Sequence, residues 1–183
     1  MENIENIRYI AFLRGINVGG HRVKMDRLRQ IFIDLGFVNV RSYINSGNIF
    51  FDTNEEGRQS MVSRIERQLQ LELGYEVSAF LRTTDELEAL LTQNPFQSIT
   101  LTEDKRFCVV FTDEALNEGL SLPVRSSKND MDLVAVNTYE AFVVWHIING
   151  RPSSGIFPQG ILPKRNTTRF FHTLNKILEA AQR

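Results

Sequence analysis

Residues 8–20 read Arg-Tyr-Ile-Ala-Phe-Leu-Arg-Gly-Ile-Asn-Val-Gly-Gly, and this stretch decides how the fold begins. Its apolar residues up to Leu13 stand at successive positions rather than at alternate ones, which is typical of a central strand covered on both faces. The strand runs into a glycine-rich segment, Arg14–Lys24, which we call the glycine loop. We therefore expect a buried strand that ends in a sharp turn.

The next elements follow from the spacing of apolar residues. Met25–Leu35 repeats at helical spacing, and strands on either side of Asn45–Asn48, the asparagine turn, predict a hairpin. Thr53 and Glu56 have capping-box spacing before a second helix, and a strand follows at Val77–Arg82. The order strand, helix, strand, strand, helix, strand indicates a ferredoxin-like split unit with an antiparallel sheet.

A similar pattern begins again after a third helix, which Thr83 and Glu86 can open. It predicts a strand at Arg106–Thr112, a short helix at Asp113–Gly119, a hairpin over 132–148, and a helix at Thr168–Ala181 with no visible final strand. The sequence thus predicts an α+β protein of two tandem ferredoxin-like halves with antiparallel sheets, the second one degenerate. The expected parts are residues 1–83, a connecting helix and loop at 84–105, and residues 106–183, all within one compact unit.

The composition is that of a globular protein, with 42% hydrophobic and 23% charged residues in a chain of 183. No apolar run approaches the roughly 20 residues that span a bilayer, and the first residues carry acids where a signal peptide carries cations. We expect a cytoplasmic protein with no membrane partner. The single cysteine, Cys108, excludes an internal disulfide and a clustered thiolate metal site.

Charge is spread unevenly along the chain. Residues 1–50 hold seven cationic and four acidic side chains, residues 51–150 hold eight and seventeen, and residues 151–183 hold six and one. Two basic ends that met in space would attract phosphate groups. The alternative is that both basic ends pair with the acidic middle.

The glycine loop and the residues around it closely resemble an uncharacterised bacterial family, the domain of unknown function 1697. The resemblance is dense over residues 8–52, where it includes the run Tyr9–Gly20 and the motif Tyr43-Ile-Asn-Ser-Gly-Asn48, and it resumes near the end. The family there shows a signature of the type Thr-x-Arg-Asn-Trp-Asn-Thr, whereas this chain has Phe170, Phe171 and His172 at the Asn, Trp and Asn positions. The resemblance implies a tandem of ferredoxin-like halves and supplies no activity.

The glycine loop is also the candidate binding site, because it leaves a buried strand and enters a helix, where backbone N–H groups can hold an anion. Its spacing matches neither the P-loop nor the dinucleotide fingerprint, and the alternative is a turn that needs glycines only to bend. We expect a small phosphate- or carboxylate-bearing ligand. The candidate ligand-binding residues are Arg14, Gly15, Asn17, Gly19, Gly20, Lys24, Ser46, Asn48, Arg165 and Arg169.

The other groups of polar residues in the sequence do not predict a catalytic or metal-binding site. Ser46 lacks the Gly-x-Ser-x-Gly elbow of a hydrolase, and the three histidines have no helical partner for zinc. Asp130 and Asp132 stand on one side of a predicted strand, where they either suit a hard cation or form a charged entry to a hairpin. We expect no metal and no cofactor, and the sequence leaves open whether the protein is an enzyme.

Two further functions compete with ligand binding. Ferredoxin-like sheets can bind RNA through exposed aromatic rings, although no RNA-recognition motif is present and most rings here stand in aliphatic runs. A self-associating structural module without a ligand is the other alternative, in which a homo-oligomer forms.

Overall fold

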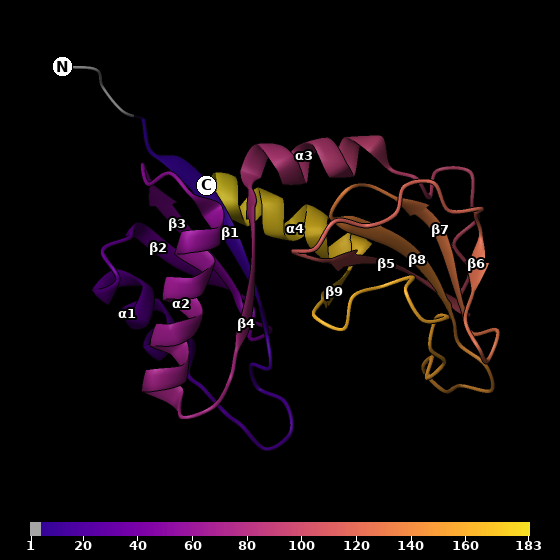
Figure 1. Cartoon of the computed structure of the whole chain (residues 1–183), viewed down its shortest axis with the longest axis horizontal. Coiled ribbons are helices and arrows are strands. Elements are labelled where there is room, and N and C mark those ends of the chain that lie inside the picture. The colour runs from indigo at the N-terminus through magenta and orange to yellow at the C-terminus, as the bar shows by residue number, and fades with distance from the viewer. Residues whose placement is uncertain (1–4) are drawn as a thin grey trace. The chain divides into compact units, whose positions relative to one another are not determined.

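The computed structural model describes residues 5–183 and divides the chain into two compact units (Figure 1). Unit 1 extends to Ala89 and takes in Ile177–Arg183, and unit 2 comprises Leu90–Lys176. Over the described residues the chain forms four helices and two antiparallel sheets. Within residues 5–183, every helix is too short or too polar to cross a bilayer.

Unit 1 follows the element order that the sequence predicts for its first half. The elements are β1 (Ile7–Arg14), α1 (Met25–Asp34), β2 (Val38–Tyr43), β3 (Asn48–Thr53), α2 (Arg58–Leu73) and β4 (Ser78–Thr83), and α3 (Thr84–Gln93) follows them. The strands pair in the order β2-β3-β1-β4, with every pair antiparallel. The first and last strands of the series are therefore neighbours in the sheet.

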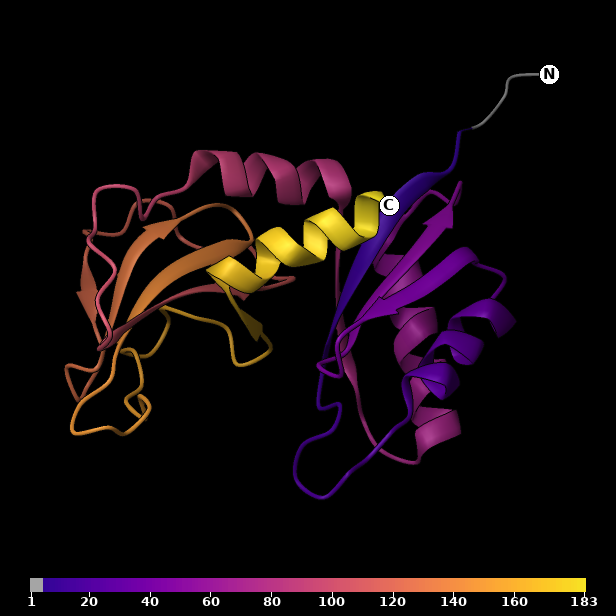
Figure 2. The same ribbon diagram turned by 180° about the vertical axis from the view of Figure 1, so that it is seen from behind.

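Strand β1 is covered on both faces, as its continuous apolar run predicts. Tyr9, Ala11 and Leu13 belong to the core that includes residues of α1 and α2, whereas Ile10 and Phe12 point the other way and are also fully buried. Figures 1 and 2 show α1 and α2 on one face of this sheet. A strand buried on both faces fixes the place where its last residue leaves the sheet.

One predicted helix start is confirmed and one is wrong. The N–H of Thr83 donates to Glu86 (2.8 Å) and the N–H of Glu86 donates to the Thr83 hydroxyl (3.1 Å), which is the capping box expected before α3. The box expected at Thr53 and Glu56 does not form, because Thr53 is still paired with Ile7 in the sheet. Helix α2 begins only after Gly57.

Unit 2 contains a second antiparallel sheet. Its strands are β5 (Lys105–Phe111), β6 (Val124–Arg125), β7 (Met131–Val136), β8 (Glu140–His146) and β9 (Thr167–Phe170), and α4 (Phe171–Gln182) ends the chain. They pair in the order β6-β7-β8-β5-β9. Without the short strand β6, this order repeats that of unit 1, with β7, β8, β5 and β9 in the places of β2, β3, β1 and β4.

The prediction of a helix over Thr168–Ala181 is wrong at its beginning. Residues 168–170 form most of β9, which pairs with the edge of β5 so that Thr168 lies opposite Val110 and Phe170 opposite Cys108. The backbone groups on that edge of β5 need partners, and β-branched threonines suit a strand. The final strand that the sequence analysis did not find thus precedes the last helix.

The helix predicted at Asp113–Gly119 is also wrong, since this segment is irregular. Its polar groups bond elsewhere: the N–H of Leu116 donates to the carbonyl of Thr138 (2.7 Å), and the N–H of Gly119 donates to the Asn117 side chain (2.9 Å). Seven residues are too few to form a stable helix when such competing hydrogen bonds exist.

Several basic residues pair with the acidic middle of the chain, as the second interpretation of the charge pattern expects. Arg8 makes two hydrogen bonds to Asp52 (2.6 and 2.7 Å) and a third to the carbonyl of Ala181 (2.7 Å) in the last turn of α4. Arg41 also donates to Ala181 (3.0 Å). Cations at a helix C-terminus satisfy its last carbonyls and its dipole. Asp52 thus holds Arg8 where α4 ends.

Replacing Asp52 with asparagine is expected to lower the free energy of unfolding by about 1–3 kcal/mol at neutral pH, because Arg8 loses a charged, partly buried partner. The hydrogen bond from Arg8 lowers the pKa of Asp52 below its ordinary value. The difference between wild type and Asp52→Asn is therefore fully present above about pH 4 and is lost as the pH falls through the folded-state pKa.

Urea unfolding at neutral pH and at about pH 3 measures this difference. Asp34→Asn is the control, since Asp34 is an exposed acid on α1. A loss for Asp52→Asn that equals the loss for the control at neutral pH, or that persists undiminished in acid, would contradict the expectation.

Candidate functional site

The glycine loop joins the buried end of β1 to the first turn of α1. Its backbone adopts positive φ at four positions: Gly15, Asn17, Gly19 and Gly20. Asparagine is one of the few residues with a side chain that adopts this conformation readily, and Asn17 uses that side chain to fix the loop. Its Oδ1 accepts the N–H of Val23 (2.7 Å), which closes the loop just before the helix begins.

The asparagine turn lies against the glycine loop, so residues as far apart in the sequence as Asn17 and Asn45, 28 positions, are in direct contact. The N–H of Leu13 donates to the carbonyl of Gly47 (2.8 Å), and the Asn17 amide donates to the carbonyl of Asn45 (3.0 Å). A Cβ at Gly47 would lie 3.0 Å from the Cβ of Leu13 and 3.2 Å from a side-chain carbon of Ile16. Glycine suits this contact and its positive φ, because a methyl group here would require Leu13 or Ile16 to shift.

Helix α1 presents its N-terminus to the same region. Lys24 occupies the N-cap position, and among the described residues no side chain caps the helix there. In the first turn the N–H of Arg27 donates to the carbonyl of Lys24 (3.0 Å), whereas the N–H groups of Met25 and Asp26 have no acceptor within the helix itself. Asp26 in that turn is favourable for the helix dipole, and its carboxylate is paired with Arg29. The helix start thus offers backbone donors and a positive end.

A cavity of about 820 Å³ lies between these parts. It is lined by Asn17, Gly20, His21, Arg22, Val23, Lys24, Met25, Asp26 and Asn45. Within residues 5–183 the two cations of this set, Arg22 and Lys24, take part in no ion pair, and both are exposed. His21 lies flat on the ring of Tyr75, with ring centroids 3.8 Å apart. The cavity therefore combines two cations with a helix N-terminus.

Some of the predicted site residues line this cavity and others lie outside it. Asn17, Gly20 and Lys24 are lining residues, whereas Arg14 ends β1 opposite Ser78 and is not. Asn48 is fully buried, and its amide donates to the carbonyl of Tyr43 (3.2 Å) and to the Ser46 hydroxyl (2.9 Å). Ser46 and Asn48 thus shape the turn that supports the cavity. Gly15 and Gly19 bend the loop beside it.

The two remaining candidates lie in unit 2, where each has partners of its own. Arg165 donates to the carboxylate of Asp113 (2.5 Å). Arg169 donates to the Thr167 hydroxyl and to the carbonyl of Thr168, both at 2.9 Å, and burial lowers its pKa to about 10, so it stays charged near neutral pH. Local contacts within unit 2 account for both arginines.

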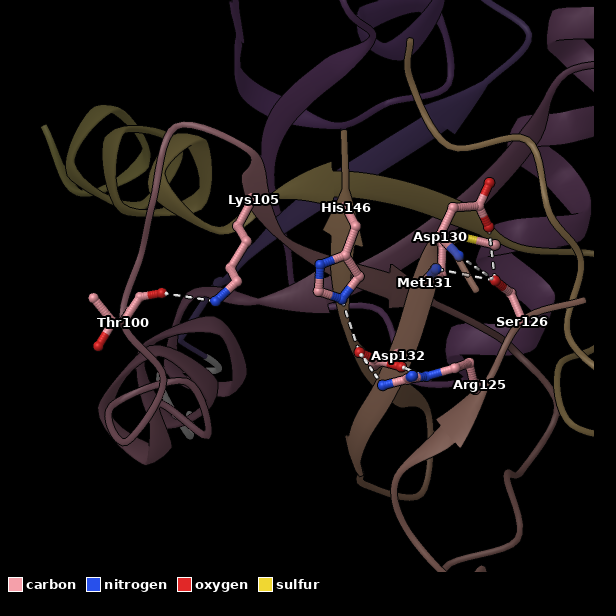
Figure 3. A network of polar contacts seen from close by, with 8 residues as sticks. All are labelled: Thr100, Lys105, Arg125, Ser126, Asp130, Met131, Asp132 and His146. Atoms are coloured by element: carbon pink, nitrogen blue, oxygen red, sulfur yellow. Dashed lines mark hydrogen bonds and ion pairs between the residues drawn. The ribbon is translucent and has the colours of Figure 1, made fainter. Parts of the chain in front are cut away.

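Asp130 and Asp132 are arranged to accept hydrogen bonds (Figure 3). Asp130 is buried and accepts from the Ser126 hydroxyl (2.7 Å) and from the N–H groups of Ser154 (2.7 Å) and Gly155 (2.8 Å). Burial opposes its ionisation, but these donors outweigh burial and lower its pKa. Asp132 accepts from Arg125 (2.7 Å) and contacts a His146 ring nitrogen (2.8 Å). The oxygen atoms of both carboxylates are thus engaged by groups of the protein itself, whereas a metal site would need them as ligands.

Neither the titratable groups nor the cysteine of the described residues indicates metal or thiol chemistry. Residues 5–183 contain no cluster of three or more His, Cys, Asp or Glu side chains that could hold a metal ion. Burial raises the pKa of Cys108 to about 12, which leaves its thiol protonated and unreactive.

The candidate residues predicted from the sequence do not include His21, Arg22 or Asn45, which line the cavity. The glycine spacing pointed to the loop, but no pattern reports that the asparagine turn folds onto it. The contact depends on the antiparallel pairing of β1 with β3, which sets Phe12 opposite Asn48 and so brings the end of β1 beside the turn.

Comparisons with known proteins show similarity over most of the chain. Residues 7–142 match the family described as "Protein of unknown function (DUF1697)". The structure is similar to that of the conserved bacterial protein SP0830 from Streptococcus pneumoniae, with 27% sequence identity and a TM-score of 0.66, over 97% of this chain and 99% of that one. No curated protein matches the chain. The family match includes the glycine loop and ends before Phe170–His172.

Replacing Gly47 with alanine is expected to lower the free energy of unfolding by at least about 2 kcal/mol, because a positive φ and a close contact both oppose the methyl group. Gly74→Ala is the matched control. Gly74 also has a positive φ, at the end of α2, but a Cβ there meets nothing within 4 Å. Urea unfolding of both variants separates the two costs, and equal losses would show that the contact with Leu13 and Ile16 is unimportant.

Proposed function

The chain belongs to the DUF1697 family of unknown function, and from its own geometry we propose that it binds a small phosphate- or carboxylate-bearing ligand at the glycine loop. The observation that carries this proposal is the cavity of about 820 Å³, in which Arg22 and Lys24 stand beside the uncapped start of α1. Such a combination of positive charge and backbone donors is a general means of binding anions.

Each part of the cavity has a role in this proposal. The guanidinium of Arg22 can make two parallel hydrogen bonds to a carboxylate or a phosphate, and the ammonium of Lys24 adds a compact charge. The missing side chain of Gly20 leaves room for an anion to approach the backbone. Asn17 keeps the loop closed through its bonds to Val23 and Asn45. The protein thus supplies the donors in a fixed arrangement.

The strand orders of the two sheets also support a proposal about the fold. We infer that both units are ferredoxin-like and derive from a duplication, because their sheets share one strand order once β6 is left out. In unit 2, the loops 112–123 and 147–166 occupy the chain positions of α1 and α2. Each copy is followed by one helix, α3 or α4.

Binding is tested by calorimetry with orthophosphate, pyrophosphate and acetate at low salt. We expect saturable binding of at least one of these anions, which weakens as the salt concentration rises. Because charge-assisted hydrogen bonds contribute about 1.5–3 kcal/mol each, the double variant Arg22→Ala, Lys24→Ala is expected to bind at least about tenfold more weakly.

Arg67→Ala is the control, since Arg67 is an exposed cation of unit 1 on α2 and does not line the cavity. It removes a similar charge and is expected to leave the affinity unchanged. If Arg67→Ala and the single variant Lys24→Ala weakened anion binding equally, the loss of affinity would come from the overall charge of the protein and not from the cavity. Failure of all three anions to bind at low salt would refute the proposal.

A further inference from the structure

The cavity at the glycine loop is larger than the anion that Arg22 and Lys24 would hold. Its volume is about 820 Å³, and sites of roughly 300–1,000 Å³ are typical of whole organic molecules. An orthophosphate or acetate ion would fill only a small part of it. Val23 and Met25, which are half-buried against the core of unit 1, add apolar walls. The cavity therefore has room for an organic group attached to the anion.

His21 supplies the only aromatic ring among the lining residues. The imidazole lies flat on the ring of Tyr75, with centroids 3.8 Å apart and an angle of 23° between the planes. Tyr75 covers one face of the imidazole but does not line the cavity, whereas His21 lines it and is exposed. The uncovered face of the imidazole is therefore the flat surface that the cavity offers to a ligand.

The segment 74–77, between α2 and β4, holds His21 in this position. It lies at the same end of the sheet as the glycine loop (Figures 1 and 2). A Cβ at Gly15 would lie 3.5 Å from the carbonyl oxygen of Glu76, so loop and segment approach closely at a second place. Within residues 5–183 the buried hydroxyl of Tyr75 has no hydrogen-bond partner, so the ring of Tyr75 supports His21. An imidazole held on one face can stack a planar group on the other without first having to be ordered.

The polar groups of the lining favour an anion that carries a base. Asp26 is the only acid among the lining residues, and its carboxylate is paired with Arg29. Arg22 and Lys24 are exposed and form no ion pair in the part of the chain that the structure describes. Asn45 also lines the cavity, and its side-chain amide has both donors and an acceptor for the edge of a planar base.

We propose that the cavity binds a nucleoside monophosphate, with the base stacked on the uncovered face of His21 and the phosphate held by Arg22 and Lys24. This inference rests on the anion site proposed above and adds the class of molecule that carries the anion. Stacking on an aromatic ring selects a planar base without selecting one particular base, because every base has a π-face. A sugar phosphate has no planar group to place on His21 and would leave the apolar walls unused.

Calorimetric titrations with AMP, ribose 5-phosphate and orthophosphate at low salt test the inference. We expect AMP to bind about tenfold more tightly than ribose 5-phosphate, because only AMP can stack a base on His21. Equal affinities for AMP and ribose 5-phosphate would overturn the inference and leave the anion site intact. Failure of all three compounds to bind would overturn both proposals.

Variants of the stacked rings separate stacking from support of the loop. His21→Ala is expected to abolish the advantage of AMP and to leave the affinity for ribose 5-phosphate unchanged, whereas His21→Phe keeps a flat ring and retains the advantage. Tyr75→Phe is expected to change neither affinity, because the hydroxyl that it removes has no partner within residues 5–183.

His172→Ala is the matched control, since His172 is an exposed histidine outside the lining. It is expected to leave both affinities unchanged. Persistence of the AMP advantage in His21→Ala, or its loss in His172→Ala, would contradict the assignment of His21. A fall in the affinity of His21→Ala for ribose 5-phosphate that matches its fall for AMP would show that His21 only holds the loop, and would also overturn the inference.

Discussion

The contact of Gly47 with Leu13 and Ile16 is the constraint on which the candidate site in unit 1 depends. It brings the asparagine turn so close to the end of β1 that a side chain at position 47 would force Leu13 or Ile16 to shift. The carbonyl of Gly47 then holds Leu13 at the end of β1, and the loop that follows is fixed through Asn17, which bonds to the carbonyl of Asn45 and to the N–H of Val23. Rigid backbone of this kind can present N–H groups to a ligand without first having to be ordered.

The two units show how sheets with one strand order can be covered in different ways. In unit 1, α1 and α2 cover the sheet, and the exposed feature is a polar loop at the start of a helix. In unit 2, separate apolar side chains of irregular segments, among them Phe157 and Leu162, pack on the core of the sheet. These irregular segments lack helical spacing, which explains why the elements of unit 2 are harder to recognise in the sequence.

The sequence predicts the elements whose signals are local and misses those that tertiary pairing decides. β1, α1 and the hairpin around Asn45–Asn48 follow from apolar spacing and turn residues, and they are found where expected. Local spacing predicts a helix over the residues of β9, because Phe170 continues the apolar stripe of α4, whereas the pairing of β9 with β5 has no local signal. Likewise, charge alone suggested Arg165 as a ligand contact, and only the structure shows Asp113 beside it.

Backbone amide shifts of the isotope-labelled chain, recorded by NMR during a titration with orthophosphate, test the central claim most directly. The account predicts saturable shifts at Gly20, Arg22 and the first turn of α1, because the anion is held by backbone donors as well as by side chains. Amides in the sheet of unit 2, such as that of Val143 in β8, should not move. Shifts that are uniformly small, or that gather on exposed arginines outside the loop, would contradict it.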